Sequence, residues 1–302
     1  RQASDELTTG HLAGFEVSLH DASPEVLKRA MERLKGDFRN STAKGRLSLT
    51  EATEALAAIH PRRTVADLGE ADFIIEAAVE DLAVKKEIFR KLDAIVRPDV
   101  VVGTNVDAGH LEGFGGIDRI LEEKLSLAAG APLAIVGPKP AHLADAARAL
   151  ARRVVTVAAD GPADWTAEDV RLSPDGHATF RVRGVEVVLP VLGRHQVGNA
   201  LVALAVADAL GVPLADAARG LAAASLPGGR TVMVEREGVT VLDDTYNANP
   251  ASMAAALELL QAVRGSRRAV VVVGTMRELG SAGADFHAAL AERVLELRPD
   301  VV

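Results

Sequence analysis

The chain has 302 residues, enough for two domains at about 100–200 residues each. Hydrophobic residues make up 48% and charged residues 25%, which is ordinary for a globular chain and excludes general disorder. The net charge of −8 argues against a nucleic-acid partner and against an anionic membrane surface. The sequence has no cysteine, so disulfides and thiolate metal sites are excluded. With no apolar run of about 18 residues and no signal peptide, we expect a cytoplasmic protein.

The first half of the chain alternates strand and helix patterns. Apolar runs predict strands at 15–19, 72–76, 100–102, 133–136 and 154–157. Helices are expected at 24–35, 49–58, 82–95 and 141–152, the first of them capped by Ser23 with Pro24 following. This β-α-β order predicts an α/β fold with a doubly wound, mostly parallel sheet, and we expect these strands to share one sheet.

The pattern changes after residue 160. A strand at 169–172, a Ser-Pro-Asp-Gly turn and a run over 177–190 broken by Gly184 predict a small antiparallel element. An alanine-rich helix follows at 197–210. After a joint at Gly228-Gly229, a second α/β unit is expected, with strands at 232–235, 239–242 and 269–273 and helices at 251–263 and 286–297. Val301-Val302 resembles the start of a buried strand, and we expect both ends of the chain to be cut.

Residues 13–105 carry one ordered set of motifs. They are Gly14-Phe-Glu-Val-Ser-Leu-His-Asp21, Lys44-Gly-Arg-Leu47, Ala71-Asp-Phe-Ile-Ile-Glu-Ala-Ala-Val-Glu-Asp-Leu82, Lys85-Lys86 and Thr104-Asn105. The set resembles the NAD-binding domain of 3-hydroxyacyl-CoA dehydrogenases. The resemblance implies that Asp21 contacts the cofactor ribose and that Glu80 and Lys85 lie along the cofactor. Alternatively, Asp21 is an aspartate at a helix start, and Glu80 and Lys85 form a solvated ion pair.

This dehydrogenase-like segment lacks the glycine-rich turn that should precede its first helix. The stretch before Gly14 has no G-x-G-x-x-G, so backbone N–H groups for a pyrophosphate are missing. The serine that the family has after Thr-Asn is also replaced, because Val106 follows Asn105. We therefore expect a vestigial NAD site and no hydride transfer.

A second set of motifs runs from about residue 98 to the end. It comprises Thr104-Asn105-Val-Asp-Ala-Gly-His110-Leu-Glu-Gly-Phe-Gly115, Glu122-Glu123-Lys124, Gly193-Arg-His195-Gln-Val-Gly-Asn199, Pro227-Gly-Gly-Arg230, Asp243-Asp244-Thr-Tyr246-Asn247-Ala-Asn249-Pro250, Gly274-Thr-Met-Arg-Glu-Leu-Gly280 and Phe286-His287. Together they resemble the Mur ligases of peptidoglycan precursor synthesis, in particular the type that adds D-alanyl-D-alanine to a UDP-muramyl tripeptide. The two resemblances meet at Thr104-Asn105. We therefore interpret the chain as a chimera of three segments, a truncated Rossmann-like segment at 1–103, a Mur ligase central-domain remnant at 104–228 and a truncated C-terminal domain at 229–302.

The Mur resemblance implies an ATP-dependent ligation through an acyl phosphate, with Mg²⁺ as a further cofactor. It implies that His110 is a Mg²⁺ ligand and that Lys124 carries a carbamate, which would offer the oxygen ligands Mg²⁺ prefers. Small-molecule substrates are implied, namely a nucleotide, a muramyl peptide and D-alanyl-D-alanine. Alternatively, His110 is a structural loop histidine and Lys124 is a solvated helix lysine. The sequence does not fix the oligomeric state.

The same resemblance implies a nucleotide site. Asn199 would contact adenine, Arg230 the phosphates and Asp244 the ribose, and the loop residues Tyr246, Asn247 and Asn249 would lie between the nucleotide and the incoming amine. The alternatives are that Asn199 caps the alanine-rich helix and that Asn249 caps the helix after it. His195 and His287 are interpreted as structural.

The Mur pattern is incomplete in this chain. No Gly-Lys dipeptide occurs, so the Gly-Lys-Thr end of a phosphate-binding loop is missing. Gln196 and Thr275 stand where asparagine and aspartate are usual. We therefore expect an impaired ligase, with an NAD-dependent oxidoreductase or an α/β protein without catalysis as the alternatives.

Overall fold

The computed structural model of the chain describes residues 16–45, 47–71, 87–88, 91–92, 95, 98–106, 116–224 and 230–302. Contacts divide the chain into two compact units, one formed by residues 1–79 and 83–97 and the other by residues 80–82 and 98–302. Among the described residues, no helix is both long and apolar enough to span a bilayer.

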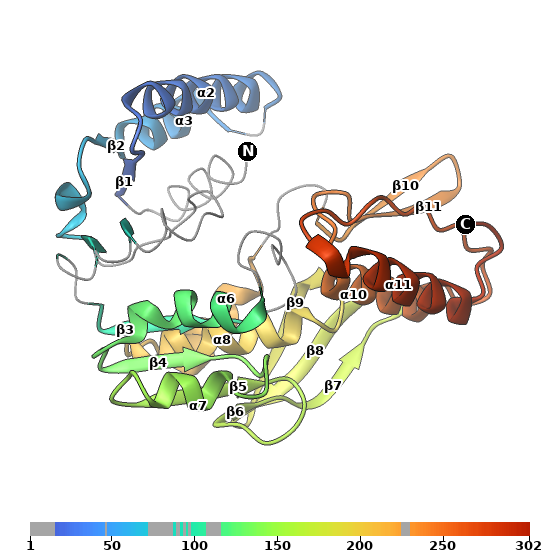
Figure 1. Ribbon diagram of the computed structural model, residues 1–302. Coiled ribbons are helices and arrows are strands. Elements are labelled where there is room, and N and C mark those ends of the chain that lie inside the picture. Colours follow the sequence, from blue (N-terminus) through green and yellow to red (C-terminus); the bar gives the residue numbers. More distant parts are fainter. Residues whose placement is uncertain are drawn as a thin grey trace. The chain divides into compact units, whose positions relative to one another are not determined.

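The first unit contains a parallel strand pair and two helices. Strand β1 (Val17–His20) pairs with β2 (Ile59–Arg62), and helices α2 (Pro24–Ala43) and α3 (Leu49–Ala57) connect them, followed by the short helix η1 (Val65–Leu68). Helix α2 starts as predicted, with Ser23 accepting a hydrogen bond from the amide of Val26 and Pro24 in the first turn. The two helices lie against each other (Figure 1), and their apolar faces enclose a small core that includes Leu34 and Phe38.

The expectation of one sheet is not met in the described part of the chain. Strand β1 pairs with β2, which the sequence did not predict, whereas the strands from β3 onward form a separate sheet. Strand β2 was missed because it contains Pro61, a residue that cannot donate a ladder hydrogen bond and is confined to edge positions. The predicted strand at 72–76 and most of the predicted helix at 82–95 lie outside the described residues.

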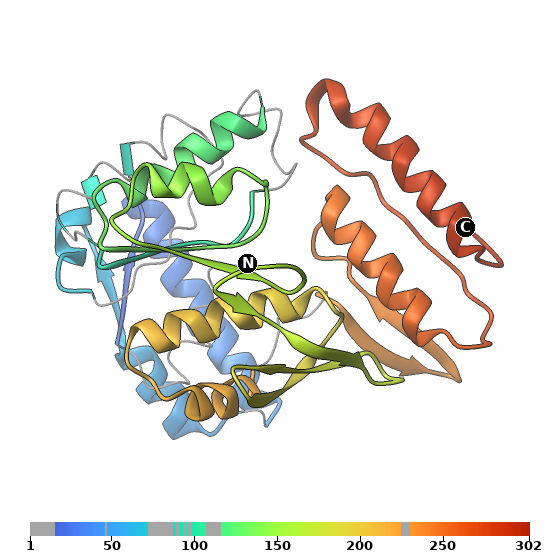
Figure 2. The ribbon, with the colours of Figure 1, turned by 90° about the horizontal axis from the view of Figure 1, so that it is seen from below.

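The second unit is built on a parallel sheet with helices on both faces. Strands β3 (Val100–Gly103), β4 (Leu133–Val136), β5 (Val154–Ala158) and β6 (Trp165–Thr166) follow one another in that order, all parallel. Ala134 and Val136 face α6 (Ile117–Leu125), with η2 (Ser126–Ala128) after it, and α7 (Leu143–Arg148), which is shorter than predicted. Ile135, between them, faces α8 (Gln196–Ala209) on the other side, as Figure 2 shows for the ribbons.

A three-stranded antiparallel sheet packs against the same helix, α8. Strands β7 (Glu168–Leu172), β8 (His177–Val182) and β9 (Val185–Leu192) pair in sequence order, and α9 (Leu214–Leu221) packs against β9. The inward side chain of Phe180 is fully buried together with Leu201 of α8. The predicted mixed α/β fold with a small antiparallel element is thereby confirmed.

The last segment consists of a hairpin and two helices. Strands β10 (Val232–Arg236) and β11 (Val239–Asp243) form an antiparallel pair, followed by α10 (Pro250–Val263), the short helix η3 (Gly280–Ala282) and α11 (Gly283–Leu297). Helices α10 and α11 lie side by side (Figure 1) and share a core with Val271 and Met276.

The predicted strand at 269–273 is reduced to a single parallel bridge between Val270 and Val301. Val271 is buried beneath the helices, but Val270 is 55% and Val272 93% exposed, so one face of this segment is bare. Val301 and Val302 are 42% and 69% exposed, so the prediction of a buried strand there is wrong. Parallel strands are normally covered on both faces, and in the described residues nothing covers this second face.

Strand β3 ends where the backbone of Gly137 closely approaches that of Thr104. A Cβ atom placed on Gly137 would lie 1.6 Å from the carbonyl oxygen of Thr104, and the amide of Gly137 donates to Gly103 at 2.9 Å. A clash with backbone cannot be relieved by a rotamer change. Gly137→Ala should therefore lower the free energy of unfolding by about 3 kcal/mol or more in urea titrations.

Gly220→Ala is the matched control, because Gly220 lies in α9 with nothing within 4 Å of its missing Cβ. That variant should be neutral or gain up to about 1 kcal/mol from helix propensity. Equal stability of the two variants would contradict the close approach at Thr104.

Candidate functional site

The carboxylate of Asp244 is fixed at the base of the β10–β11 hairpin. Thr231 precedes β10 and Asp244 follows β11, so the hairpin brings the two residues together. The amide and the hydroxyl of Thr231 donate to Oδ1 of Asp244 at 2.8 Å and 3.0 Å. Thr231 is buried, with 7% of its surface exposed. One carboxylate oxygen is thus occupied by the fold, and Oδ2 takes part in neither of these bonds.

Arg230 directly precedes Thr231, the residue that holds Asp244. Its guanidinium carbon lies 4.1 Å from the centroid of the Tyr246 ring, a cation–π arrangement that holds the flexible side chain in one orientation. Its Nε atom is buried and has no hydrogen-bond partner within the described parts of the chain. Buried polar groups without partners are rare, and a donor of this kind is suited to an anionic ligand.

The loop after Asp244 leads into α10. Asn249 accepts a hydrogen bond from the amide of Ser252 at 2.8 Å, and the hydroxyl of Ser252 accepts one from the amide of Asn249 at 3.1 Å. This capping box confirms the structural alternative for Asn249. The side chain of Asn247 is exposed, and its oxygen accepts a hydrogen bond from the amide of Ala248 at 2.9 Å.

The start of α8 is the second part of the candidate site. Asn199 lies inside the helix, one turn from its start, and its side chain donates to Gln196 at 2.9 Å. The alternative that Asn199 caps this helix is wrong, because the capping position is His195. Asn199 is exposed, whereas the ring of His195, an exposed residue as a whole, lies against the backbone of Gly193, which removes water from that side of the imidazole.

Packing and charge connect His195 with the Asp244 loop. Desolvation lowers the pKa of His195, and the carboxylates of Asp244 and Glu258 oppose this shift. An apolar contact lies nearby, in which Leu192 at the end of β9 packs with Leu259 and Val263 of α10. The beginning of α8 and the end of β11 are therefore neighbours within the second unit.

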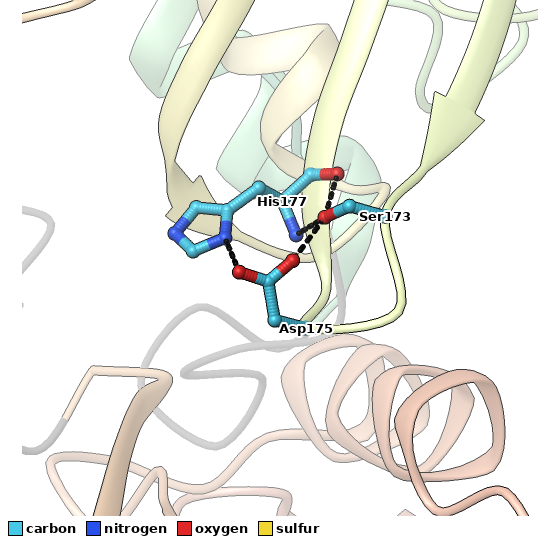
Figure 3. Close-up of polar contacts among 3 residues, drawn as sticks. All are labelled: Ser173, Asp175 and His177. Carbon is cyan, nitrogen blue, oxygen red and sulfur yellow. Dashed lines mark hydrogen bonds and ion pairs between the residues drawn. The ribbon is translucent and has the colours of Figure 1, made fainter.

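A Ser-Asp-His cluster in the turn between β7 and β8 is structural (Figure 3). The hydroxyl of Ser173 donates to the carboxylate of Asp175, and His177 Nδ1 lies 3.0 Å from the other carboxylate oxygen. Ser173 also accepts from the amide of His177 at 3.0 Å. A hydrolase triad needs the hydroxyl on the histidine ring, but here both contact the aspartate. The Ser173 hydrogen bond lowers the pKa of Asp175 and keeps the turn closed.

His287 is held by two backbone groups. The amide of Met276 donates to Nε2 at 3.1 Å, so Nε2 is the acceptor and Nδ1 carries the proton that it donates to the carbonyl of Gly283 at 2.7 Å. Both ring nitrogens are engaged. The structural interpretation of His287 is confirmed.

The residues implied as Mg²⁺ ligands are not brought together among the described residues. Lys124 is exposed on α6, whereas its neighbour Glu123 is fully buried. His110 lies outside the described residues. The described parts of the chain contain no group of three metal-ligating side chains, so they do not form a Mg²⁺ site by themselves. A shared site of Lys124 and His110 stays a prediction.

On the dehydrogenase-like side, Asp21 lies within the described part of the chain. Its Oδ1 accepts a hydrogen bond from the amide of Ser23 at 2.8 Å, which confirms the alternative of an aspartate at a helix start. Glu80 and Lys85 lie outside the described residues.

Sequence reasoning missed Thr231, the residue that fixes Asp244. Its backbone φ of 52° is uncommon for a β-branched residue, and no sequence pattern announces it. Its place directly after the Pro-Gly-Gly-Arg230 motif is the one available signal.

Comparison with protein families gives two separate matches. Residues 8–112 match the 3-hydroxyacyl-CoA dehydrogenase NAD-binding domain, and residues 229–301 match the Mur ligase glutamate ligase domain. Both resemblances inferred from the motifs are confirmed.

Curated relatives are UDP-N-acetylmuramoyl-tripeptide--D-alanyl-D-alanine ligases. The Bacillus subtilis enzyme is 31% identical over 203 residues, covering 65% of this chain and 43% of its own length. The Mycobacterium bovis enzyme is 36% identical over 210 residues, covering 65% and 41%. The chain thus spans less than half the length of these relatives.

Solved structures show the same fold. A MurF from Acinetobacter baumannii superposes with a TM-score of 0.63 at 24% identity, covering 99% of this chain and 60% of its own. MurF ligase from Thermotoga maritima in complex with ADP gives a TM-score of 0.61 at 23% identity, covering 96% and 68%.

The engagement of Asp21 generates a prediction about NAD. Without glycine amides for the pyrophosphate, the remaining ribose hydrogen bonds contribute about 1 kcal/mol each. NAD should bind more weakly than roughly 1 mM, or about −4 kcal/mol, in calorimetry. Micromolar binding that is lost in Asp21→Ala would contradict this, and retained binding in that variant would place NAD elsewhere.

Proposed function

Because the larger part of this chain is related to the Mur ligase family, we propose that residues from about 98 to 302 carry the nucleotide side of an amide ligase. The reaction is the addition of D-alanyl-D-alanine to a UDP-muramyl tripeptide, which is the activity named for the curated relatives. The substrates are a nucleotide, the muramyl peptide and the dipeptide. The NAD-dependent alternative is not favoured, because the relatives found are ligases.

The observation that supports the proposal most directly is the state of Arg230. Its guanidinium is held on Tyr246, and its buried Nε lacks a partner in the described chain. A phosphate oxygen would satisfy that donor and would interact with the positive charge. Asp244, fixed by Thr231, is suited to accept hydrogen bonds from ribose hydroxyls through Oδ2.

Asn199 at the start of α8 completes the proposed nucleotide site. It is exposed and presents an amide that can both donate to and accept from an adenine edge. Asn247 and Tyr246 shape the loop beside the phosphates, and Asn249 positions that loop by starting α10. The side chains are thereby assigned to binding and orientation.

ATP would supply the phosphoryl group that activates the carboxylate of the muramyl tripeptide, which the amine of D-alanyl-D-alanine would then attack with release of phosphate. His110 and Lys124, the latter as a carbamate, remain the proposed Mg²⁺ ligands. The described residues do not assemble a metal site by themselves.

Nucleotide binding is tested first. Arg230→Ala should weaken ADP binding about ten- to hundredfold in calorimetry, which corresponds to about 1.5–3 kcal/mol for a charge-assisted hydrogen bond. Arg230→Lys should lose part of this, because an ammonium cannot reproduce the stacked, forked guanidinium. Arg236→Ala is the control, since Arg236 is exposed on the same hairpin. An equal loss in the control, or none in Arg230→Ala, would refute the phosphate assignment.

Ligation is tested separately. The 302-residue chain has no Gly-Lys dipeptide, so the backbone cradle and lysine for the β- and γ-phosphates are absent from it. Loss of one preorganised donor commonly costs about 10²–10³ in rate, and here a whole loop is missing. We expect no detectable amide product from ATP, muramyl tripeptide and D-alanyl-D-alanine. Phosphate release that requires the peptide acceptor and vanishes in Lys124→Ala would overturn this expectation.

A further inference from the structure

The segment 272–278, which leads from Val271 towards η3, has little backbone support. Within the described part of the chain, its residues make no hydrogen bond from backbone to backbone. Glu278 has a φ of 63°, which is uncommon for a residue other than glycine, so local preference does not explain the shape of the segment. Met276 is the buried side chain of this segment and packs in the core between α10 and α11.

His287 supplies a polar contact that fixes this segment to α11. The amide of Met276 donates to Nε2 of the ring at 3.1 Å, and Nδ1 bonds to the carbonyl of Gly283, one turn earlier in the same helix, at 2.7 Å. A backbone amide can only donate and a backbone carbonyl can only accept. The two bonds therefore fit one form of the ring, the neutral imidazole with its proton on Nδ1.

We propose that His287 is a pH-sensitive latch, which holds the segment 272–278 to α11 while its ring is neutral and releases it when the ring takes up a second proton from solvent. That proton would sit on Nε2 and point at the amide of Met276, so a hydrogen bond is replaced by two N–H groups in contact. The bond to Gly283 is kept, because Nδ1 donates in both forms. The release is therefore confined to the segment and leaves the start of α11 in place.

The surroundings of the ring decide what the latch affects. The titratable and charged groups on the neighbouring parts of the surrounding elements are Arg277 and Glu278 in the segment, Asp285 and Glu292 on α11, Glu258 on α10 and Asp244 before the loop to α10. These charges bias the pH of opening, but both ring nitrogens are already bonded to backbone. Ala248, in the loop after Asp244, packs against the same apolar cluster as Met276, so the two loops share one support. The inference does not depend on the proposed function.

Hydrogen exchange of the full chain tests the latch at about pH 7.5 and about pH 5.5, on either side of the range in which histidine changes charge. After correction for the intrinsic exchange rate, the protection factor of the Met276 amide should fall about fivefold at the lower pH, the equivalent of one hydrogen bond. The amide of Leu290, further along α11, should keep its protection. An equal loss at both amides would mean that the helix opens as well, and would overturn the proposal.

Two variants separate the charge of the ring from its packing. In His287→Ala, the Met276 amide should exchange rapidly at both pH values. In His287→Gln, the side-chain oxygen can accept the same bond but does not titrate, so protection should no longer change with pH. His142→Gln, at the start of α7, is the control and should keep the pH dependence of the wild type. PH-dependent protection that persists in His287→Gln would refute the latch.

The ¹⁵N spectrum of the wild-type ring is a measurement that needs no variant. At about pH 7.5 it should show the tautomer with the proton on Nδ1. The tautomer with the proton on Nε2 would contradict the bond from Met276 and with it the proposal.

Discussion

The candidate site depends on one small apolar contact. Leu192 at the end of β9 packs against Leu259 and Val263 of α10, with Met233 and Leu242 of the hairpin beside them. Burial of such side chains contributes about 1.5–3 kcal/mol each. Leu192 leads into the segment that carries His195 and Asn199, and the hairpin of Met233 and Leu242 is flanked by Arg230 and Asp244. This contact therefore connects the two parts of the proposed nucleotide site.

The polar groups of the site are organised by local backbone rather than by one another. Asp244 is held by Thr231, Asn249 by the first turn of α10, and the His195 ring by Gly193. Each group is fixed by neighbours close to it in the chain, and the apolar contact of Leu192 with α10 connects the elements. This separates the two requirements of the site, because rigidity comes from hydrogen bonds and assembly from packing.

The sequence predicted elements whose signals are local. Strand β4 at 133–136 and the Ser23-Pro24 helix start follow from a short apolar run and from capping chemistry. The predictions failed where the structure depends on residues distant in the sequence. Strand β2, which pairs with β1, was not predicted because it contains Pro61, and the strand predicted at 269–273 forms a single bridge, with Val301. In the site, sequence motifs indicated Arg230 and Asp244. The stacking of Arg230 on Tyr246 and the hydrogen bonds from Thr231 to Asp244 depend on how the hairpin folds, and no sequence pattern predicts them.

The bare face at Val270 and Val272 has a consequence for the behaviour of the protein in solution. A short extended segment with exposed valines at 270 and 272 offers an apolar surface for pairing between molecules. β-branched side chains favour such pairing, and no proline or lysine within 269–273 opposes it. Any association through this segment would increase with protein concentration, whatever the stability of the individual molecule.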